Sequence, residues 1–96
     1  IPILPIALIS EVLLENKNIW KSELDLKSQA LQKIELLRKK GAPIDISSGA
    51  SEGVLNNALT MLVGRRLVDV EENLIRPKEE ALVLLEYYAN SIKQWK

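Results

Sequence analysis

Cysteine and histidine are both absent from this 96-residue chain, and so is any net charge. Without cysteine there can be no disulfide and no thiolate. Without histidine the usual zinc sites and the histidine-based catalytic triads are excluded. The 13 basic and 13 acidic residues cancel, so no overall field recruits nucleic acid or an anionic membrane. We therefore expect no bound metal and no cofactor.

Long hydrophobic runs are scarce as well. The uncharged opening IPILPIALIS is shorter than the roughly 20 apolar residues that span a bilayer, and it lacks the basic region of a signal peptide. What is present is an ordinary globular composition, 47% hydrophobic and 27% charged. An uncharged Ile-Pro start is an unusual natural terminus. We therefore expect residues 1–96 to form one domain cut from a longer protein.

The first predicted helix, over residues 5–15, is apolar around nearly its whole circumference. A helix of that kind is normally buried on all sides, which three other helices of a small domain can scarcely achieve. We therefore expect part of it to face a neighbour outside this chain. Ile3, Leu4 and Leu8 are the contact residues predicted there.

Three further helices and a hairpin account for most of the remaining pattern. The second helix follows the N-cap Ser22, ends at Gly41 and carries a predicted core stripe of Leu24, Leu31, Ile34 and Leu37. A third helix is predicted over residues 51–66, two strands over 67–70 and 74–76, and a last helix after Pro77. This order predicts a mainly α, winged-helix-like domain with three helices, a short β-hairpin and a C-terminal helix. A small bundle with an inserted hairpin is the alternative.

Two patterns that could suggest catalysis have simpler structural explanations. Residues 49–53, GASEG, match G-x-S-x-G, but a nucleophile elbow needs a preceding strand, an α/β sheet and a histidine base. We interpret Ser51 as a helix N-cap instead. Asp69, Glu71 and Glu72 lie near a hairpin tip, where solvation leaves them unsuited to general acid chemistry.

A DNA-reading third helix is a further hypothesis that the residues disfavour. Asn56 and Asn57 could reach base edges, but Glu52 beside them repels phosphate. The hairpin is acidic, and Arg65 and Arg66 close the helix at its far end, where cations suit the helix dipole. Binding of nucleic acid is therefore not expected.

The last helix has two faces of interest. Its predicted core stripe contains Ala81, Leu85, Tyr88, Ile92 and Trp95, at about 100° per residue. A second strip, well round from the first, contains Val83, Tyr87, Asn90 and Gln94. Two interpretations stay open for this strip: scattered surface apolar residues, which are common, or a contact face to which tyrosine supplies area and a hydroxyl.

Several short strings, taken in order, resemble one family. The string Tyr87-Tyr88-Ala89-Asn90-Ser91-Ile92 follows Arg76-Pro77 and a leucine-rich turn. Weaker matches precede it: the apolar opening over residues 3–14, Glu23-Leu24, Gly41-Ala42-Pro43, and Leu62 with Arg65-Arg66-Leu67-Val68. Together they resemble the C-terminal region of bacterial glycerol-3-phosphate acyltransferases.

The resemblance implies a parent enzyme that transfers a fatty acyl group from an acyl thioester to glycerol 3-phosphate. This is the first committed acylation of phospholipid synthesis, at the cytoplasmic face of the membrane. The family's catalytic His and Asp, four residues apart, have no counterpart here, so no catalytic, cofactor or metal residue can be assigned.

The chain is accordingly expected to be a soluble, non-catalytic accessory domain that docks on the upstream catalytic domain. The opening helix and Val83, Tyr87 and Asn90 are the predicted contacts. A free-standing winged-helix adaptor or DNA-binding domain is the alternative function. Alternatively, two copies of the fragment bury this apolar surface against each other in a homodimer.

Overall fold

The computed structural model describes residues 3–44, 51–93 and 95. Within them the order of elements is α1 (Pro5–Glu15), β1 (Lys21–Ser22), α2 (Glu23–Lys39), α3 (Ser51–Gly64), β2 (Val68–Glu71), β3 (Leu74–Pro77), a 3-10 turn (Glu79–Ala81) and α4 (Leu82–Lys93). The expected class, mainly helical with a short hairpin and a C-terminal helix, is confirmed. Residues 45–50, between the second and third helices, and Gln94 of the second strip lie outside the described residues.

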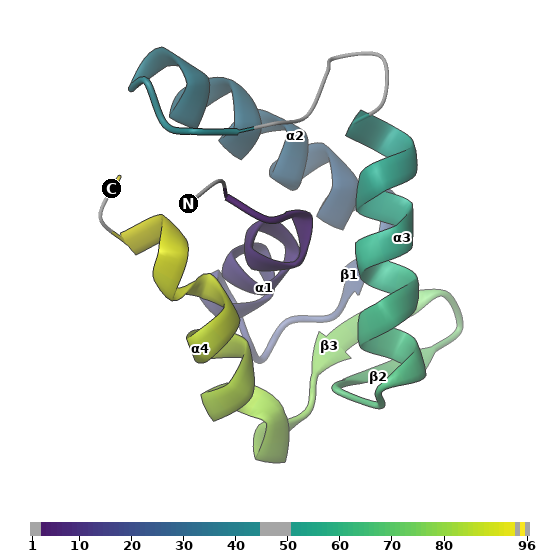
Figure 1. Ribbon diagram of the computed structural model, residues 1–96. Coiled ribbons are helices and arrows are strands. Elements are labelled where there is room, and N and C mark those ends of the chain that lie inside the picture. Colours follow the sequence, from purple (N-terminus) through teal and green to yellow (C-terminus); the bar gives the residue numbers. More distant parts are fainter. Residues whose placement is uncertain (1–2, 45–50, 94, 96) are drawn as a thin grey trace.

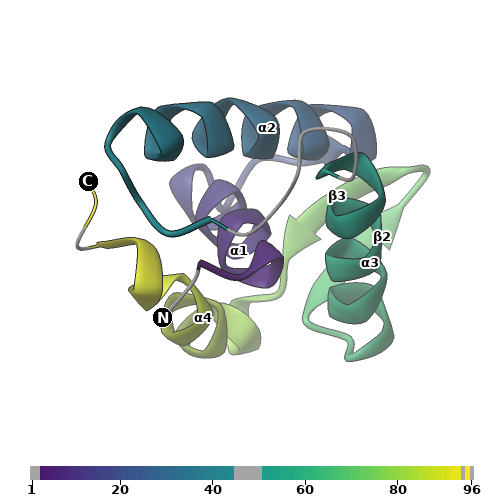
Figure 2. The same ribbon diagram turned by 45° about the horizontal axis from the view of Figure 1, so that its top comes forward.

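Helix α1 occupies the centre of the molecule, with α2, α3 and α4 arranged around it (Figure 1). In the turned view α2 crosses above α1 while α4 lies below it (Figure 2). All residues from Ala7 to Leu13 are buried, including Ser10 and Glu11. The expectation that this helix is partly exposed to an absent neighbour is therefore wrong for Ala7–Leu13. Its own chain covers this stretch, because β3 also contacts α1.

Two of the contact residues predicted at the start of the chain belong to this core. Ile3 is 2% exposed and Leu8 is fully buried, so neither offers surface to a partner. The backbone N–H of Ile3 donates to the Pro43 carbonyl at 2.8 Å, which holds the chain start against the end of α2. Leu4 alone of the three is exposed, at 55%.

Helix α2 begins as predicted but buries a different stripe. The Asp25 backbone N–H donates to Ser22 Oγ at 3.0 Å, which makes Ser22 the N-cap. The buried residues of α2 are Leu26, Ala30, Ile34 and Leu37. Leu24 is 74% exposed, because it lies about 120° around the helix from the middle of that stripe. The predicted core positions of Leu24 and of the partly exposed Leu31 are thus corrected.

The hairpin joins a three-stranded antiparallel sheet of order β1-β3-β2. Val70 lies opposite Ile75 and Glu71 opposite Leu74, which leaves Glu72 and Asn73 as a two-residue loop. Both loop residues have positive φ angles, 49° and 67°, as a type I′ turn requires. Strand β1, which pairs Lys21 with Ile75, is too short to be read from the sequence.

Helices α2 and α3 end in the same way, with different residues at the critical position. Gly41 and Arg66 both adopt left-handed φ angles, 79° and 59°. After α2 the Ala42 N–H donates to the Leu37 carbonyl, and after α3 the Leu67 N–H donates to the Leu62 carbonyl, at 3.0 and 3.1 Å. These bonds define two Schellman motifs. Only the first has the glycine that this conformation favours.

This difference predicts opposite effects on stability. Arg66→Gly should raise the free energy of unfolding by about 1 kcal/mol, because glycine adopts the left-handed conformation without the steric cost of a Cβ. Gly41→Ala should lower it by a similar amount, since no atom lies within 4 Å of the added Cβ and only the backbone strain remains. Equilibrium urea unfolding measures both. Arg66→Ala is the control, and an equal gain from alanine would refute the argument.

Candidate interaction surface

The carboxylates considered for catalysis are placed on the hairpin. Asp69 Oδ2 lies 3.7 Å from Arg76 Nη2, while Glu71 and Glu72 are exposed. Arg76 also lies over the Trp20 ring, 4.5 Å from its centroid. Across residues 3–44, 51–93 and 95, no group of three metal-ligating side chains comes together.

A polar depression of about 480 Å³ lies beside this pair. It is lined by Lys17, Asn18, Asp69, Arg76, Pro77, Glu79, Glu80 and Leu82. Two cations and three carboxylates therefore share one shallow site. The mixture gives no preference for an anionic substrate, because Arg76 already pairs with Asp69.

The serine of the GASEG string is part of a helix. Ser51 is the first residue of α3 and is 4% exposed, so it lies within the first turn and not before it. Helix ends are defined only to within one or two residues, so this is a small shift from the predicted N-cap. Gly49 and Ala50 lie outside the described residues.

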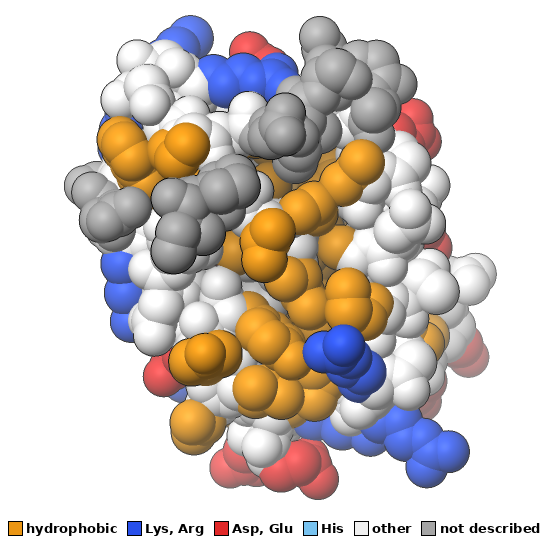
Figure 3. All heavy atoms as spheres, viewed as in Figure 1, with side chains coloured by type: hydrophobic (Ala, Val, Ile, Leu, Met, Phe, Trp, Pro, Cys, Tyr) orange, Lys and Arg blue, Asp and Glu red, His pale blue; other side chains and the backbone are white. Residues whose placement is uncertain are grey.

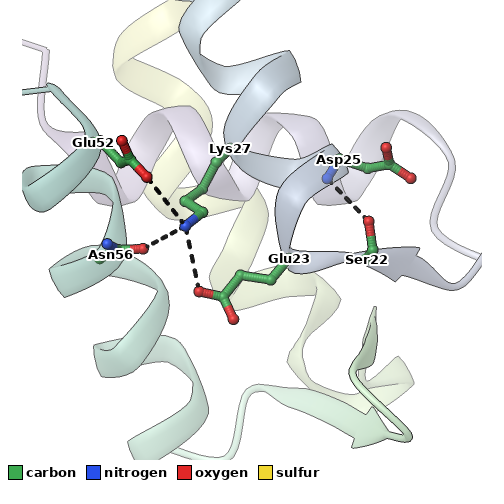
Figure 4. A network of polar contacts seen from close by, with 6 residues as sticks. All are labelled: Ser22, Glu23, Asp25, Lys27, Glu52 and Asn56. Atoms are coloured by element: carbon green, nitrogen blue, oxygen red, sulfur yellow. Dashed lines mark hydrogen bonds and ion pairs between the residues drawn. The ribbon is translucent and has the colours of Figure 1, made fainter.

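The polar side chains at the start of α3 serve to attach this helix to α2. Lys27 Nζ donates to Asn56 Oδ1 at 2.9 Å and lies 3.6 Å from Glu23 Oε1 and 3.9 Å from Glu52 Oε1 (Figure 4). Asn56, one of the two residues considered for reading bases, is thereby occupied within the domain. The acidic partners around it would also repel a phosphate backbone.

Lysine 21 is the one ionisable group with a clearly shifted pKa in the described chain. It is 6% exposed, and its Nζ donates to the Val12 carbonyl at the end of α1 at 2.6 Å. Burial lowers the pKa of Lys21 below its ordinary value of 10.5; Glu15 opposes this shift and Lys33 adds to it. Glu15 in turn pairs with Lys33 at 3.0 Å, so this corner joins α1, β1 and α2.

The two adjacent tyrosines of α4 point to different environments. Tyr88 is partly buried against the core, and its hydroxyl accepts a hydrogen bond from Arg65 Nη1 at 3.0 Å. Tyr87 is 70% exposed and Val83 is 79% exposed, with Asn90 also at the surface. The predicted core stripe of Ala81, Leu85 and Ile92 is buried, and it also includes Ala89. We call Val83, Tyr87 and Asn90 the Tyr87 strip.

A groove lies between the chain start and α3, and sequence reasoning missed it. It has a volume of about 250 Å³ and is lined by Leu4, Pro5, Ile6, Val54, Asn57, Ala58 and Met61, which we call the α1–α3 groove. Met61 is 38% exposed although it lies on a helix with a strongly apolar face. In Figure 3 hydrophobic side chains gather over the area between α1, α3 and α4. The molecule therefore presents an apolar face composed of three helices.

None of the helices in the described part of the chain is both long enough and apolar enough to cross a bilayer. The apolar face between α1, α3 and α4 is instead typical of a domain that contacts another surface.

The fold and this face define a small, mainly helical domain with an apolar face at its surface. The family described as glycerol-3-phosphate acyltransferase C-terminal region matches residues 1–95 of the chain. The chain belongs to that family, and the resemblance inferred from the tyrosine string is confirmed. Searches of curated proteins and of solved structures found no match.

The buried lysine predicts a pH dependence. Because its folded pKa is lowered, the unfolded state binds more protons between that pKa and 10.5, so stability should rise with pH across this alkaline window. The unfolding free energy of the wild-type chain minus that of Lys21→Met should therefore increase as the pH rises from the lowered pKa toward 10.5. Lys17→Met, at an exposed lysine, is the control. A constant difference for Lys21→Met would contradict the assignment.

The polar network on α3 predicts weak binding of DNA. With Asn56 held by Lys27, we expect a dissociation constant no tighter than about 10⁻⁴ M for duplex DNA at physiological salt. Fluorescence anisotropy at several salt concentrations measures it. Tight binding that falls steeply as salt rises, and that Asn57→Ala weakens, would instead support a DNA-binding domain.

Proposed function

We propose that this chain is the non-catalytic C-terminal domain of a winged-helix-like class, and that it docks on the catalytic domain of a glycerol-3-phosphate acyltransferase. The parent enzyme would transfer a fatty acyl group from an acyl thioester to glycerol 3-phosphate in phospholipid synthesis, at the cytoplasmic face of the membrane. The observation that carries this proposal is the family match over residues 1–95. A family defined as the C-terminal region of an acyltransferase supports a catalytic domain in the same protein.

The absence of histidine supports a non-catalytic role for this part. The family's catalytic histidine would act as the base on the glycerol hydroxyl, and this chain contains none. Its carboxylates at the hairpin are exposed or paired with Arg76, so they do not replace such a base.

The docking role is supported by apolar surface that the domain does not use. Val83 and Tyr87 lie one turn apart on α4 and are both more than two-thirds exposed. Burying a valine side chain is worth about 1.5–3 kcal/mol, and tyrosine is among the residues that carry most of the binding energy of interfaces. Asn90 extends the same strip with an amide, and Leu4 is the exposed contact at the chain start. Ile3 and Leu8 take no part, because they are in the core.

The proposal predicts that the Tyr87 strip matters to the intact enzyme. Val83→Ser combined with Tyr87→Ser should lower acyl transfer by roughly tenfold or accelerate thermal inactivation, because two anchors of the interface are lost. Acyl transfer from an acyl thioester to glycerol 3-phosphate is measured before and after heating. The control is Leu24→Ser with Leu36→Ser, which alters two leucines of α2 that are 74% and 59% exposed.

A deletion completes the test. Removal of residues 1–96 from the intact enzyme should destabilise it and reduce its activity. Full activity with unchanged stability would refute docking. Equal losses from the strip pair and the α2 pair would show that exposed apolar residues contribute without a specific interface.

A further inference from the structure

Arg65 is a guanidinium without a carboxylate partner in the described chain. It is exposed just after the end of α3, and its side-chain hydrogen bond within the described chain is to the Tyr88 hydroxyl, at 3.0 Å. The ion pairs among residues 3–44, 51–93 and 95 involve Lys27, Lys33, Arg38 and Arg76, and none involves Arg65. The bond to Tyr88 fixes the position of this charge between α3 and α4.

Arg65 also continues the α1–α3 groove. Its backbone N–H donates to the Met61 carbonyl at 2.9 Å, so the two residues lie one helical turn apart on the same side of α3. Met61 lines the groove together with Leu4 and Ile6 from the chain start. Beyond Tyr88 the face reaches Leu84, which is 39% exposed. An apolar groove and a fixed cation are thus adjacent on one surface.

We propose that the α1–α3 groove and Arg65 together receive an apolar side chain and a neighbouring carboxylate from the catalytic domain of the same enzyme. This inference rests on the proposed docking function and names the chemistry of the partner surface. The apolar side chain enters the groove, whose lining is hydrophobic apart from Asn57. The carboxylate accepts charge-assisted hydrogen bonds from a guanidinium that Tyr88 already orients, which reduces the entropy lost on pairing.

A protein surface fits this site better than the other occupants. Binding to an anionic membrane takes several cations at about 1 kcal/mol each, whereas both signs of charge lie along the lower rim of the apolar area in Figure 3. A concave groove also suits a protruding side chain. A symmetric second copy would place one patch against an identical patch, so each Arg65 would again lack a carboxylate from this patch.

Because residues 1–96 contain no cysteine, a thiol introduced there is the only one in this domain, and its labelled peptide can be followed separately from the rest of the enzyme. Met61→Cys and Val63→Cys place single thiols on α3 at positions that are 38% and 41% exposed. Met61 lines the α1–α3 groove, whereas Val63 lines the opposite groove between α3 and the hairpin. Alkylation of each thiol is followed by mass spectrometry in the intact enzyme and in the chain of residues 1–96. The alkylation rate of Met61→Cys should be at least about tenfold lower in the intact enzyme than in the chain of residues 1–96, whereas the rate of Val63→Cys should be the same in both.

Arg65 is tested in the same assay. Adding Arg65→Glu to Met61→Cys in the intact enzyme should raise the alkylation rate at least about tenfold. The substitution places a carboxylate opposite the proposed carboxylate of the catalytic domain, and the two repel each other. Arg66→Glu makes the same charge change at the next residue, which is also exposed, and should leave the protection in place. Equal effects of the two substitutions would overturn the assignment to Arg65.

The remaining outcomes separate this inference from the proposed function. If Tyr87→Cys is protected in the intact enzyme and Met61→Cys is not, docking holds and the groove is not its site. If neither is protected, docking itself fails. Protection that needs added phosphatidylglycerol vesicles would assign the groove to the membrane. Protection of the isolated chain that rises with its concentration would assign it to a second copy. Either of the last two results overturns the proposal.

Discussion

A helix that is apolar on every side needs neighbours on every side, and in this chain α2, α3, α4 and β3 supply them for α1. Leu8, Ile9 and Leu13 are completely buried, and each such side chain is worth about 1.5–3 kcal/mol. The positions of α2, α3, α4 and β3 follow from this requirement, and β1 and β2 are placed by their pairing with β3. The other three helices surround α1, and the sheet closes the side that remains (Figures 1 and 2).

Polar contacts join the elements to one another, and that of Lys21 is buried against α1. Lys27 joins α2 to Asn56 of α3, Lys40 Nζ donates to the Trp95 carbonyl at 2.8 Å, and Lys21 joins β1 to the end of α1. Lys27 and Lys40 join segments 29 and 55 residues apart, whereas Lys21 joins segments nine residues apart. These three lysines are therefore engaged inside the domain and are not offered to a ligand.

Much of the fold could be predicted because its signals are local. The Ser22 cap, the Gly41 stop, the hairpin and the helical class each depend on residues within a few positions of one another. The candidate surface was predicted in part: Val83, Tyr87 and Asn90 lie opposite a strong core stripe, so their exposure followed from the helical period. Met61 gave no such signal, since an apolar residue on an apolar helix normally indicates core.

The sequence alone was therefore sufficient for the helices, the Ser22 cap, the Gly41 stop, a turn within residues 71–73, the lack of histidine and cysteine chemistry and the family to which the chain belongs. Only the tertiary structure decided which apolar residues remain at the surface. Leu8 is buried and Leu24 is exposed although both are leucines on helices, because burial depends on where α2, α3 and α4 lie around α1. The same packing brings Arg65 to Tyr88 across 23 residues of sequence, a contact that no local pattern encodes.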